Sequence, residues 1–209
     1  MIGHAGRKLT TLIVDGRPLE PEHAIYLVVA ACQAAARDDY RSRLLPGQVL
    51  LPGRVLIFDR GDITIGPIDI EDIDLGYLPP ELAPPPGARS PGQRTEQVIH
   101  KPNGDVVMRS GFRVEPRELS EEVARRADVF VLGCVLWELL AGRRLFKGRM
   151  PHESLALVCE AQVPDVPDAP PELDAIVRKA LAKDVADRYQ SLGELAAVLA
   201  EYLVGRARN

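Results

Sequence analysis

The chain has 209 residues, of which 46% are hydrophobic, so it can bury a sizeable core as one large domain or two small ones. Its formal net charge of -4 and its pI near 5.6 argue against general nucleic-acid binding, which requires a basic surface to neutralise phosphates. No apolar run approaches the ~20 residues of a membrane-spanning helix, and the first residues lack the apolar core of a signal peptide. We therefore expect a globular cytoplasmic protein that neither binds nucleic acid nor inserts into a membrane.

The first region, residues 7 to 38, contains two helical stretches separated by a break at Pro18 to Pro21. The first is short and runs from Leu9 to Val14. In the second, apolar residues recur at helical spacing and share one face: Ala24, Leu27, Val28, Ala31 and Cys32. This spacing predicts a helix that packs on the core.

The second region, roughly residues 44 to 126, is rich in proline and glycine and contains two hairpin signals. In GQVLLPGRVLIFDRGDITIGPID, two short apolar runs, Val55 to Ile57 and Ile63 to Ile65, flank a turn at residues 59 to 62. In EQVIHKPNGDVVMRSGF, the pair Asn103-Gly104 stands between apolar runs, and both residues tolerate the positive φ that a tight turn needs. We expect a small hairpin at each place, with the proline cluster YLPPELAPPPG between them.

From about residue 127 the chain is expected to be helical again. The stretch ADVFVLGCVLWELLAG is apolar nearly all round, which predicts a buried central helix, with Phe130, Trp137 and Phe146 in the core. Amphipathic helices with Pro, Ser or Asp near their starts follow at HESLALVCEAQ, PPELDAIVRKALAK and SLGELAAVLAEYL.

Cysteines and histidines give no sign of a metal site. The three cysteines, Cys32, Cys134 and Cys159, are widely spaced in apolar surroundings, which favours buried free thiols over disulfides or metal ligands. The four histidines are scattered, with no partner four residues on: His4, His23, His100 and His152. We expect neither a metal nor a cofactor.

Several of these stretches resemble the C-terminal lobe of serine/threonine protein kinases. The segment ADVFVLGCVLWELLAGRRLF is similar to the central helix of that lobe, and PPELDAIVRKALAKDVADRYQSLGELAAVLAEYL resembles the closing helices of the bacterial members. The segment GYLPPEL resembles the end of the activation segment, on the pattern Y-M-A-P-E. The segment GRKLTTLIVDGRPLEPEHAIYLVVAAC is similar to the two helices that follow the interlobe hinge.

The resemblance implies one domain over residues 1 to 209, mainly α (α+β), with a kinase C-lobe-like helical fold and short β-hairpins. It leaves no residues for the N-terminal lobe with its glycine-rich loop and phosphate-pairing lysine, so we expect that lobe to be absent. A segment at about 88 to 118 has no counterpart in the family pattern and is expected to be an inserted hairpin.

The catalytic-loop pattern H-R-D-x-K-P-x-N can be laid without gaps on GQVLLPGR. The base then becomes Val49, the phosphate-contacting lysine becomes Leu51, and the metal-binding asparagine becomes Arg54. Continuing without a gap, the D-F-G motif begins at Pro67. Phosphoryl transfer depends on positioning and on metal-held charge neutralisation, so the sequence predicts a catalytically inactive pseudokinase, not an enzyme.

A shifted alignment would allow an aspartate in this region to act as a metal ligand instead. The candidates are Asp59, Asp62 and Asp69, although capping a turn or facing solvent is the favoured interpretation for each.

Residues that hold the kinase fold together are retained. The resemblance implies that Glu81 pairs with a buried Arg188 and that Asp128, at the opening of the central helix, binds the catalytic-loop backbone as a structural cap. Buried charges are costly unless paired, so their retention points to a fold that persists for a reason other than catalysis.

The favoured function is a protein-interaction or regulatory module in bacterial signalling or cell organisation, and the low lysine content suggests a bacterial high-GC genome. The partner is another protein of unknown identity or a second copy of the chain. The expected partner-binding residues lie on the inserted hairpin: Val98, Ile99, His100, Val106, Val107 and Met108. That hairpin could instead pack on the lobe or be a surface insertion without a role. The alternative function is a nucleotide-dependent switch, or a kinase half completed by a partner that supplies an N-terminal lobe.

Overall fold

The computed structural model describes residues 6–14, 16–37, 55–57, 62–65, 75–82, 95–100, 106–111 and 119–208. Within these ranges the fold is mainly α with two small antiparallel sheets, as the sequence predicts. The helices are α1 (Thr10–Val14), α2 (Pro21–Arg37), α3 (Glu121–Ala141), α4 (Pro151–Glu160), α5 (Pro171–Ala180) and α6 (Leu192–Arg206). The described residues also form the single-turn 3-10 helices η4 (Leu75–Tyr77), η5 (Pro80–Leu82) and η6 (Val185–Asp187).

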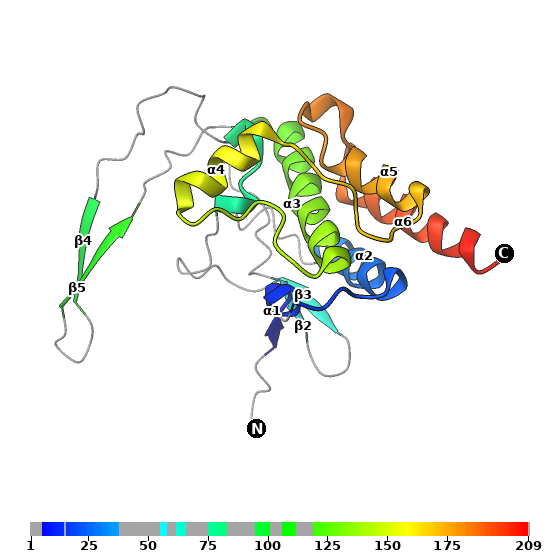
Figure 1. The fold of residues 1–209 in the computed structure, drawn as a ribbon, viewed down its shortest axis with the longest axis horizontal. Helices are drawn as coiled ribbons and strands as arrows, with labels where there is room; N and C mark the ends of the chain where they lie inside the picture. The colour runs from blue at the N-terminus through cyan, green and yellow to red at the C-terminus, as the bar shows by residue number, and fades with distance from the viewer. Residues whose placement is uncertain are drawn as a thin grey trace.

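Helix α3 is the centre of the molecule. In Figure 1 it stands with α4 on one side and α2, α5 and α6 on the other. It contacts α2, α5 and α6, and its residues from Ala127 to Leu140 are all buried. An apolar helix surrounded by other helices loses most of its surface to packing, which is why its sequence shows no polar face. The core therefore forms around α3, with Trp137 and Phe130 fully buried in it.

Helix α3 begins at Glu121, earlier than the sequence analysis placed it. Ser120 is the N-cap and its side chain accepts a hydrogen bond from the Val123 amide. Glu122 pairs with Arg126 one turn further on. A serine cap and acidic residues in the first turn stabilise a helix N-terminus, so this polar first turn extends the apolar helix into solvent.

The first sheet contains a strand that the sequence analysis missed. Strands β2 (Val55–Ile57) and β3 (Ile63–Ile65) pair antiparallel, as predicted, and β1 (Arg7–Lys8) adds to the other edge of β2. The Leu9 amide continues this pairing with a 2.8 Å hydrogen bond to the Val55 carbonyl. A two-residue strand has too little pattern to be read from sequence, because its partner across the sheet defines it.

The second sheet is a two-stranded antiparallel hairpin of β4 (Thr95–His100) and β5 (Val106–Gly111). Its register places Val98 opposite Met108 and Ile99 opposite Val107. Figure 1 draws both strands away from the helices. The residues that join them, Asn103 and Gly104 included, lie outside the described ranges.

Candidate functional site

The candidate site is the segment of residues 75 to 82, which contains η4 and η5 and corresponds to the GYLPPEL motif. Helix α4 contacts η4 on one side. On the other side, Leu82 packs against Ala127 and Val131 of α3. The segment is therefore held between the central helix and α4.

A buried cluster fixes the first part of the segment. The Tyr77 hydroxyl donates a 2.6 Å hydrogen bond to Glu138 Oε2, in the last turn of α3. The other carboxylate oxygen accepts from Arg144 Nε at 2.9 Å and from the Leu145 amide at 2.8 Å. The Arg144 guanidinium carbon also lies 4.2 Å from the centre of the Tyr77 ring. Tyrosine, glutamate and arginine thus form one compact unit beneath η4.

Burial shifts the proton equilibria of this cluster. It raises the pKa of the fully buried Glu138 above its ordinary value, and the positive charge of Arg144 is the largest opposing influence. The pKa of Tyr77 is raised first by burial and then by the nearby Glu138 charge, so Tyr77 remains a protonated donor. Three donors converge on the Glu138 carboxylate, an arrangement that favours its ionised form.

A second ion pair fixes the other part of the segment. Arg188 donates through both terminal nitrogens to the two carboxylate oxygens of Glu81, at 2.8 and 2.9 Å. The arginine side chain is fully buried and also donates to the Ala182, Lys183 and Arg126 carbonyls. The pair expected from the sequence is therefore formed, and its bidentate geometry is the strongest that arginine and carboxylate make.

These two clusters determine what the segment can do chemically. Tyr77 is tied to α3, and Glu81 is tied to an arginine that follows η6. Both carboxylates are engaged by guanidinium groups, so neither is set up as a general base. The arrangement makes the segment a structural element that is anchored at both ends to the helical core.

Asp128 does not open the central helix, contrary to the sequence-based expectation. It lies within α3, is only 1% exposed, and is preceded by the Ser120 cap. Its expected contact with the catalytic-loop backbone involves residues 47 to 54, which lie outside the described ranges. The capping role at this helix N-terminus belongs to Ser120, because α3 begins earlier than its apolar stretch.

The degenerate catalytic positions are not described by the structure: Val49, Leu51, Arg54 and Pro67. The same holds for Asp59 and Asp69, whereas Asp62 is described and exposed. The expected partner-binding residues fall on the two strands of the hairpin, at Val98, Ile99, His100, Val106, Val107 and Met108.

Sequence reasoning missed the roles of Glu138 and Arg144. A signal for the first was present, because Glu138 interrupts the apolar stretch from Val129 to Leu140, and a buried carboxylate needs a charged or hydrogen-bonding partner. Its arginine partner gave no comparable signal. Arg144 follows the helix in a loop with several basic residues, and any of them was a possible partner.

The cysteines are free thiols, as expected, but only two of them are buried. Cys32 and Cys134 lie in the core, and burial raises the pKa of Cys32 to about 12. Cys159 is partly exposed because it lies on α4, whose outer face meets solvent. Among the described residues no group of three histidine, cysteine or acidic side chains could hold a metal ion. No helix in the described ranges has the length and apolar character to span a bilayer.

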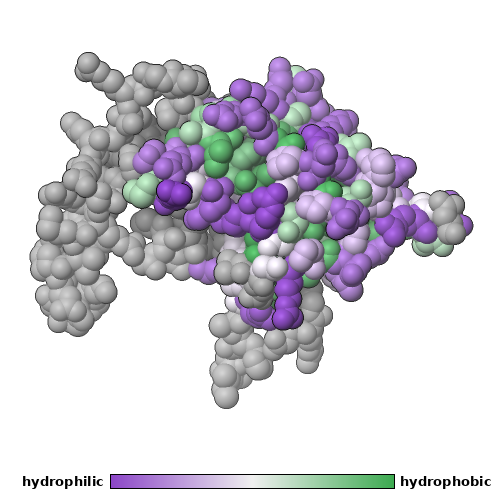
Figure 2. Space-filling view, in the orientation of Figure 1, coloured by the Kyte–Doolittle hydropathy of each residue, from purple (hydrophilic) through white to green (hydrophobic). Residues whose placement is uncertain are grey.

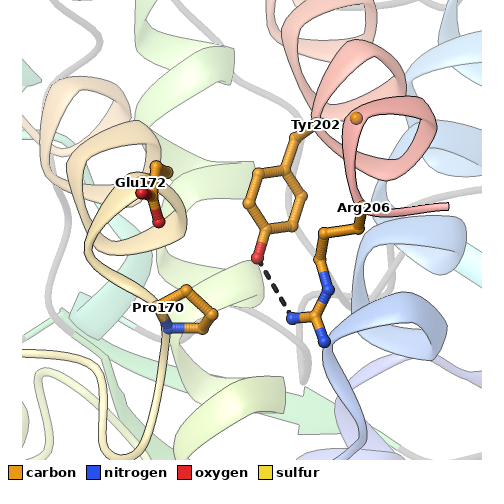
Figure 3. A pocket seen from close by; sticks show the side chains of 5 residues that line it. Pro170, Glu172, Tyr202 and Arg206 are labelled. Atoms are coloured by element: carbon orange, nitrogen blue, oxygen red, sulfur yellow. Dashed lines mark hydrogen bonds between the residues drawn. The ribbon is translucent and has the colours of Figure 1, made fainter. Parts of the chain in front are cut away.

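A surface hollow lies between the start of α5 and the end of α6, lined by Pro170, Glu172, Tyr202, Gly205 and Arg206. Figure 3 shows the Tyr202 ring between Glu172 and Arg206. The Tyr202 hydroxyl accepts a 3.3 Å hydrogen bond from Arg206 Nη1, and Arg206 Nε lies 3.5 Å from Glu22. Arg206 is therefore engaged by other residues of the chain. The residues that line the hollow provide neither a nucleophile nor a set of metal ligands.

Comparison with known proteins relates the chain to one family of enzymes. It is 44% identical over 206 residues to serine/threonine-protein kinase PknB of Mycolicibacterium smegmatis, a match that covers 97% of this chain and 30% of the relative. PknB of Mycobacterium tuberculosis is 43% identical over 199 residues, with 93% of this chain and 28% of the relative covered. A kinase of Streptomyces coelicolor, named probable serine/threonine-protein kinase SCO3848, is 29% identical over 198 residues. This match covers 91% of this chain and 26% of the relative. No protein-family model matches the chain.

These relatives correct one expectation from the sequence. The prediction that the chain is not an enzyme is wrong on this comparison, because the relatives carry the name of an enzyme, serine/threonine-protein kinase. The chain spans less than a third of the length of these curated relatives. With nearly all of its own residues matched and a helical fold built around α3, it is a homologue of bacterial serine/threonine protein kinases and corresponds to a C-lobe-like segment of them.

Proposed function

We propose that the chain acts in bacterial serine/threonine kinase signalling as a protein-binding regulatory module, and that the β4–β5 hairpin is its partner-binding element. The kinase relatives support the signalling context. The observation that carries the binding role is the hairpin itself: within the described residues, neither β4 nor β5 pairs with a third strand. Each strand therefore keeps one edge that another strand could join.

The energetics of a lone hairpin support this role. Two antiparallel strands with no further packing are marginally stable in water, so such a ribbon gains most from a partner. An extended segment of another protein that adds to a free edge would contribute backbone hydrogen bonds along the strand. The register also places three pairs beside the turn that carry mostly apolar residues: Val98 with Met108, Ile99 with Val107, and His100 with Val106.

Successive residues of a strand alternate between the two faces of the ribbon. Val98 and Ile99 are therefore on opposite faces, and so are Met108 and Val107. Docking one face on a flat surface would leave apolar residues of the other face in water. A partner that adds a strand and also covers a face would engage both the free edge and the apolar residues. A second copy of the chain could bind in a similar way.

The test replaces residues 95 to 112 with a short Gly/Ser linker. We expect the variant to melt cooperatively near the wild-type temperature and to lose its partner in affinity capture from the source cells, or its dimer mass in multi-angle light scattering. The control variant Tyr26→Ser removes an exposed apolar side chain on α2 and should retain association. Association that survives the replacement of the hairpin would contradict the proposed role.

A second candidate is favoured by the names of the relatives, which are protein kinases. In this candidate, the chain is one half of a kinase and a partner supplies the nucleotide-binding half. Phosphotransfer from radiolabelled ATP should then appear only when chain and partner are mixed. A thermal-shift titration with ATP and magnesium complements the phosphotransfer assay by measuring nucleotide binding. A ligand present at 100 times its Kd adds about 2.7 kcal/mol to the free energy of unfolding.

A further inference from the structure

The hollow between the start of α5 and the end of α6 contains two opposite charges that do not pair with each other. Its volume of about 430 Å³ lies within the range of roughly 300 to 1,000 Å³ that is typical of small-molecule sites. Figure 3 shows Glu172 and Arg206 on opposite sides of the Tyr202 ring. The ion pair that Arg206 makes is with Glu22 of α2 and not with Glu172. A space therefore remains between a carboxylate and a guanidinium group.

Both charged groups keep hydrogen-bonding capacity that the described part of the chain does not use. Arg206 donates through Nη1 to the Tyr202 hydroxyl, and its Nε lies 3.5 Å from Glu22, which leaves Nη2 without a hydrogen bond to any described residue. The Glu172 carboxylate likewise makes no hydrogen bond or ion pair within the described ranges. Guanidinium offers several donors and carboxylate several acceptor sites, so a ligand could bind each group without displacing an existing contact.

The position of each charge on its helix favours its ionised form. Glu172 lies in the first turn of α5 and Arg206 in the last turn of α6. The N-terminal end of a helix dipole favours a carboxylate, and the C-terminal end favours a cation. Each side chain thus stabilises its own helix, which accounts for both residue types without a ligand. Helix stabilisation does not require, however, that the two charges line one hollow without pairing.

Apolar surface lies between the two charges. The Tyr202 and Pro170 rings line the hollow, and Gly205 leaves one side of it open, because nothing lies within 4 Å of a Cβ atom built there. Figure 2 shows mostly hydrophilic residues over this end of the molecule, where α5 begins and α6 ends in Figure 1. The apolar surface of the hollow therefore borders polar and charged residues, which suits a short methylene chain better than a lipid tail.

We propose that this hollow binds a small zwitterion, with its ammonium group on Glu172, its carboxylate on Arg206 and a short methylene chain over the Tyr202 ring. A ligand with a single charge would be attracted by one side of the hollow and repelled by the other, whereas a zwitterion complements both. Because the ring separates the two protein charges, the ligand charges have to be several bonds apart, as in an ω-amino acid. The hollow does not involve the hairpin, so this inference does not rest on the proposed function.

The test titrates the full chain with γ-aminobutyrate and follows amide chemical shifts by NMR, with the Glu172 and Gly205 amides as reporters of the hollow. We expect saturable shifts of both at about millimolar ligand, because exposed ion pairs contribute little each. Butylamine and butyrate have the same chain length with one charge, and glycine has both charges without the spacer. Each of these three compounds should bind at least about threefold more weakly.

Two variants assign the charges of the ligand to the two sides of the hollow. Glu172→Gln and Arg206→Gln should each weaken the binding of γ-aminobutyrate about threefold or more, which is what one exposed ion pair contributes. Glu172→Gln should not weaken the binding of butyrate, because it removes a like charge. The controls Glu160→Gln and Arg208→Gln make the same charge changes at exposed positions that do not line the hollow, and should leave binding unchanged. Thermal melts establish that each variant is folded.

Three results would overturn the proposal. The first is the absence of saturable shifts at Glu172 and Gly205 when γ-aminobutyrate is added to the folded wild-type chain. The second is binding of butylamine or butyrate as tight as that of γ-aminobutyrate, which would mean that only one of the charges is used. The third is an equal loss of binding in the control variants, which would mean that the ligand responds to general charge and not to this hollow.

Discussion

Arg188 binds the carboxylate of Glu81 through two hydrogen bonds of 2.8 and 2.9 Å, across a sequence separation of 107 residues. The arginine side chain is fully buried, and the glutamate side chain is 13% exposed. The pair connects the 75–82 segment to the turn that follows η6. A long-range contact of this kind is available only to the folded chain, so its loss should appear directly in stability.

Arg188→Ala should lower the free energy of unfolding by about 3 to 5 kcal/mol, because it leaves a largely buried carboxylate without its counter-charge. Arg125→Ala is the control, since Arg125 pairs with Glu121 on the exposed surface of α3 and should cost no more than about 0.5 kcal/mol. Urea denaturation of both variants measures the difference. Similar small losses in the two variants would mean that the Glu81 pair is dispensable.

Tyr77→Phe should lower the free energy of unfolding by about 1.5 to 3 kcal/mol, because it deletes a hydrogen bond to the charged, buried Glu138 and fills the same volume. Tyr26→Phe removes a hydroxyl from a side chain that is 60% exposed and should have no measurable effect. Denaturation midpoints at neutral pH measure both. A neutral Tyr77→Phe variant would contradict a role of this hydroxyl in holding η4.

Arg144→Met should destabilise the protein more at pH 8 than at pH 5. Burial already raises the pKa of Glu138, and Arg144 is the largest influence that lowers it, so the variant should raise this pKa further. A carboxyl group whose pKa is raised on folding contributes stability below its unfolded pKa and loses it as pH rises through the folded pKa. The uncompensated charge therefore costs most at high pH.

The double variant Arg144→Met with Glu138→Gln provides the control, because it has no carboxyl group to titrate at this position. Its stability relative to the wild type should vary less between about pH 5 and pH 8 than that of the single variant. Denaturant titrations at the two pH values measure this. A penalty for Arg144→Met that is the same at both pH values would show that Glu138 does not respond to the arginine.

Gly142→Ala should lower the free energy of unfolding by more than about 1 kcal/mol, because Gly142 ends α3 with a φ of 63°, a conformation that L-residues adopt at a cost. A Cβ atom there would also lie 2.5 Å from the Pro18 nitrogen. Gly205→Ala is the matched control. Nothing lies within 4 Å of a Cβ at that helical position, so the change should be neutral or stabilising. Thermal melts of the two variants should shift in opposite directions or by clearly different amounts.

Elements whose stability is local, or whose pattern extends over many residues, could be predicted from the sequence. The apolar stretch of α3 has no polar face, so burial at the centre of the molecule was the outcome its composition allowed. Paired strands occur on both sides of the Asn103-Gly104 turn signal, because the apolar runs that flank it have strand character. The pairing of Glu81 with Arg188 followed from the family resemblance, since the residues at both ends match kinase motifs.

The partners of residues that are distant in sequence, or that have several possible partners, could be identified only in the folded chain. Arg144 was one basic residue among several until the loop after α3 brought it against Glu138 and the Tyr77 ring. Strand β1 exists because β2 lies beside it, and two residues without that neighbour have no preference strong enough to be recognised. Helix α3 begins at the Ser120 cap with a polar first turn, and a search for hydrophobic periodicity does not detect a polar turn. In each case the deciding free energy comes from a contact between segments and not from the segment's own composition.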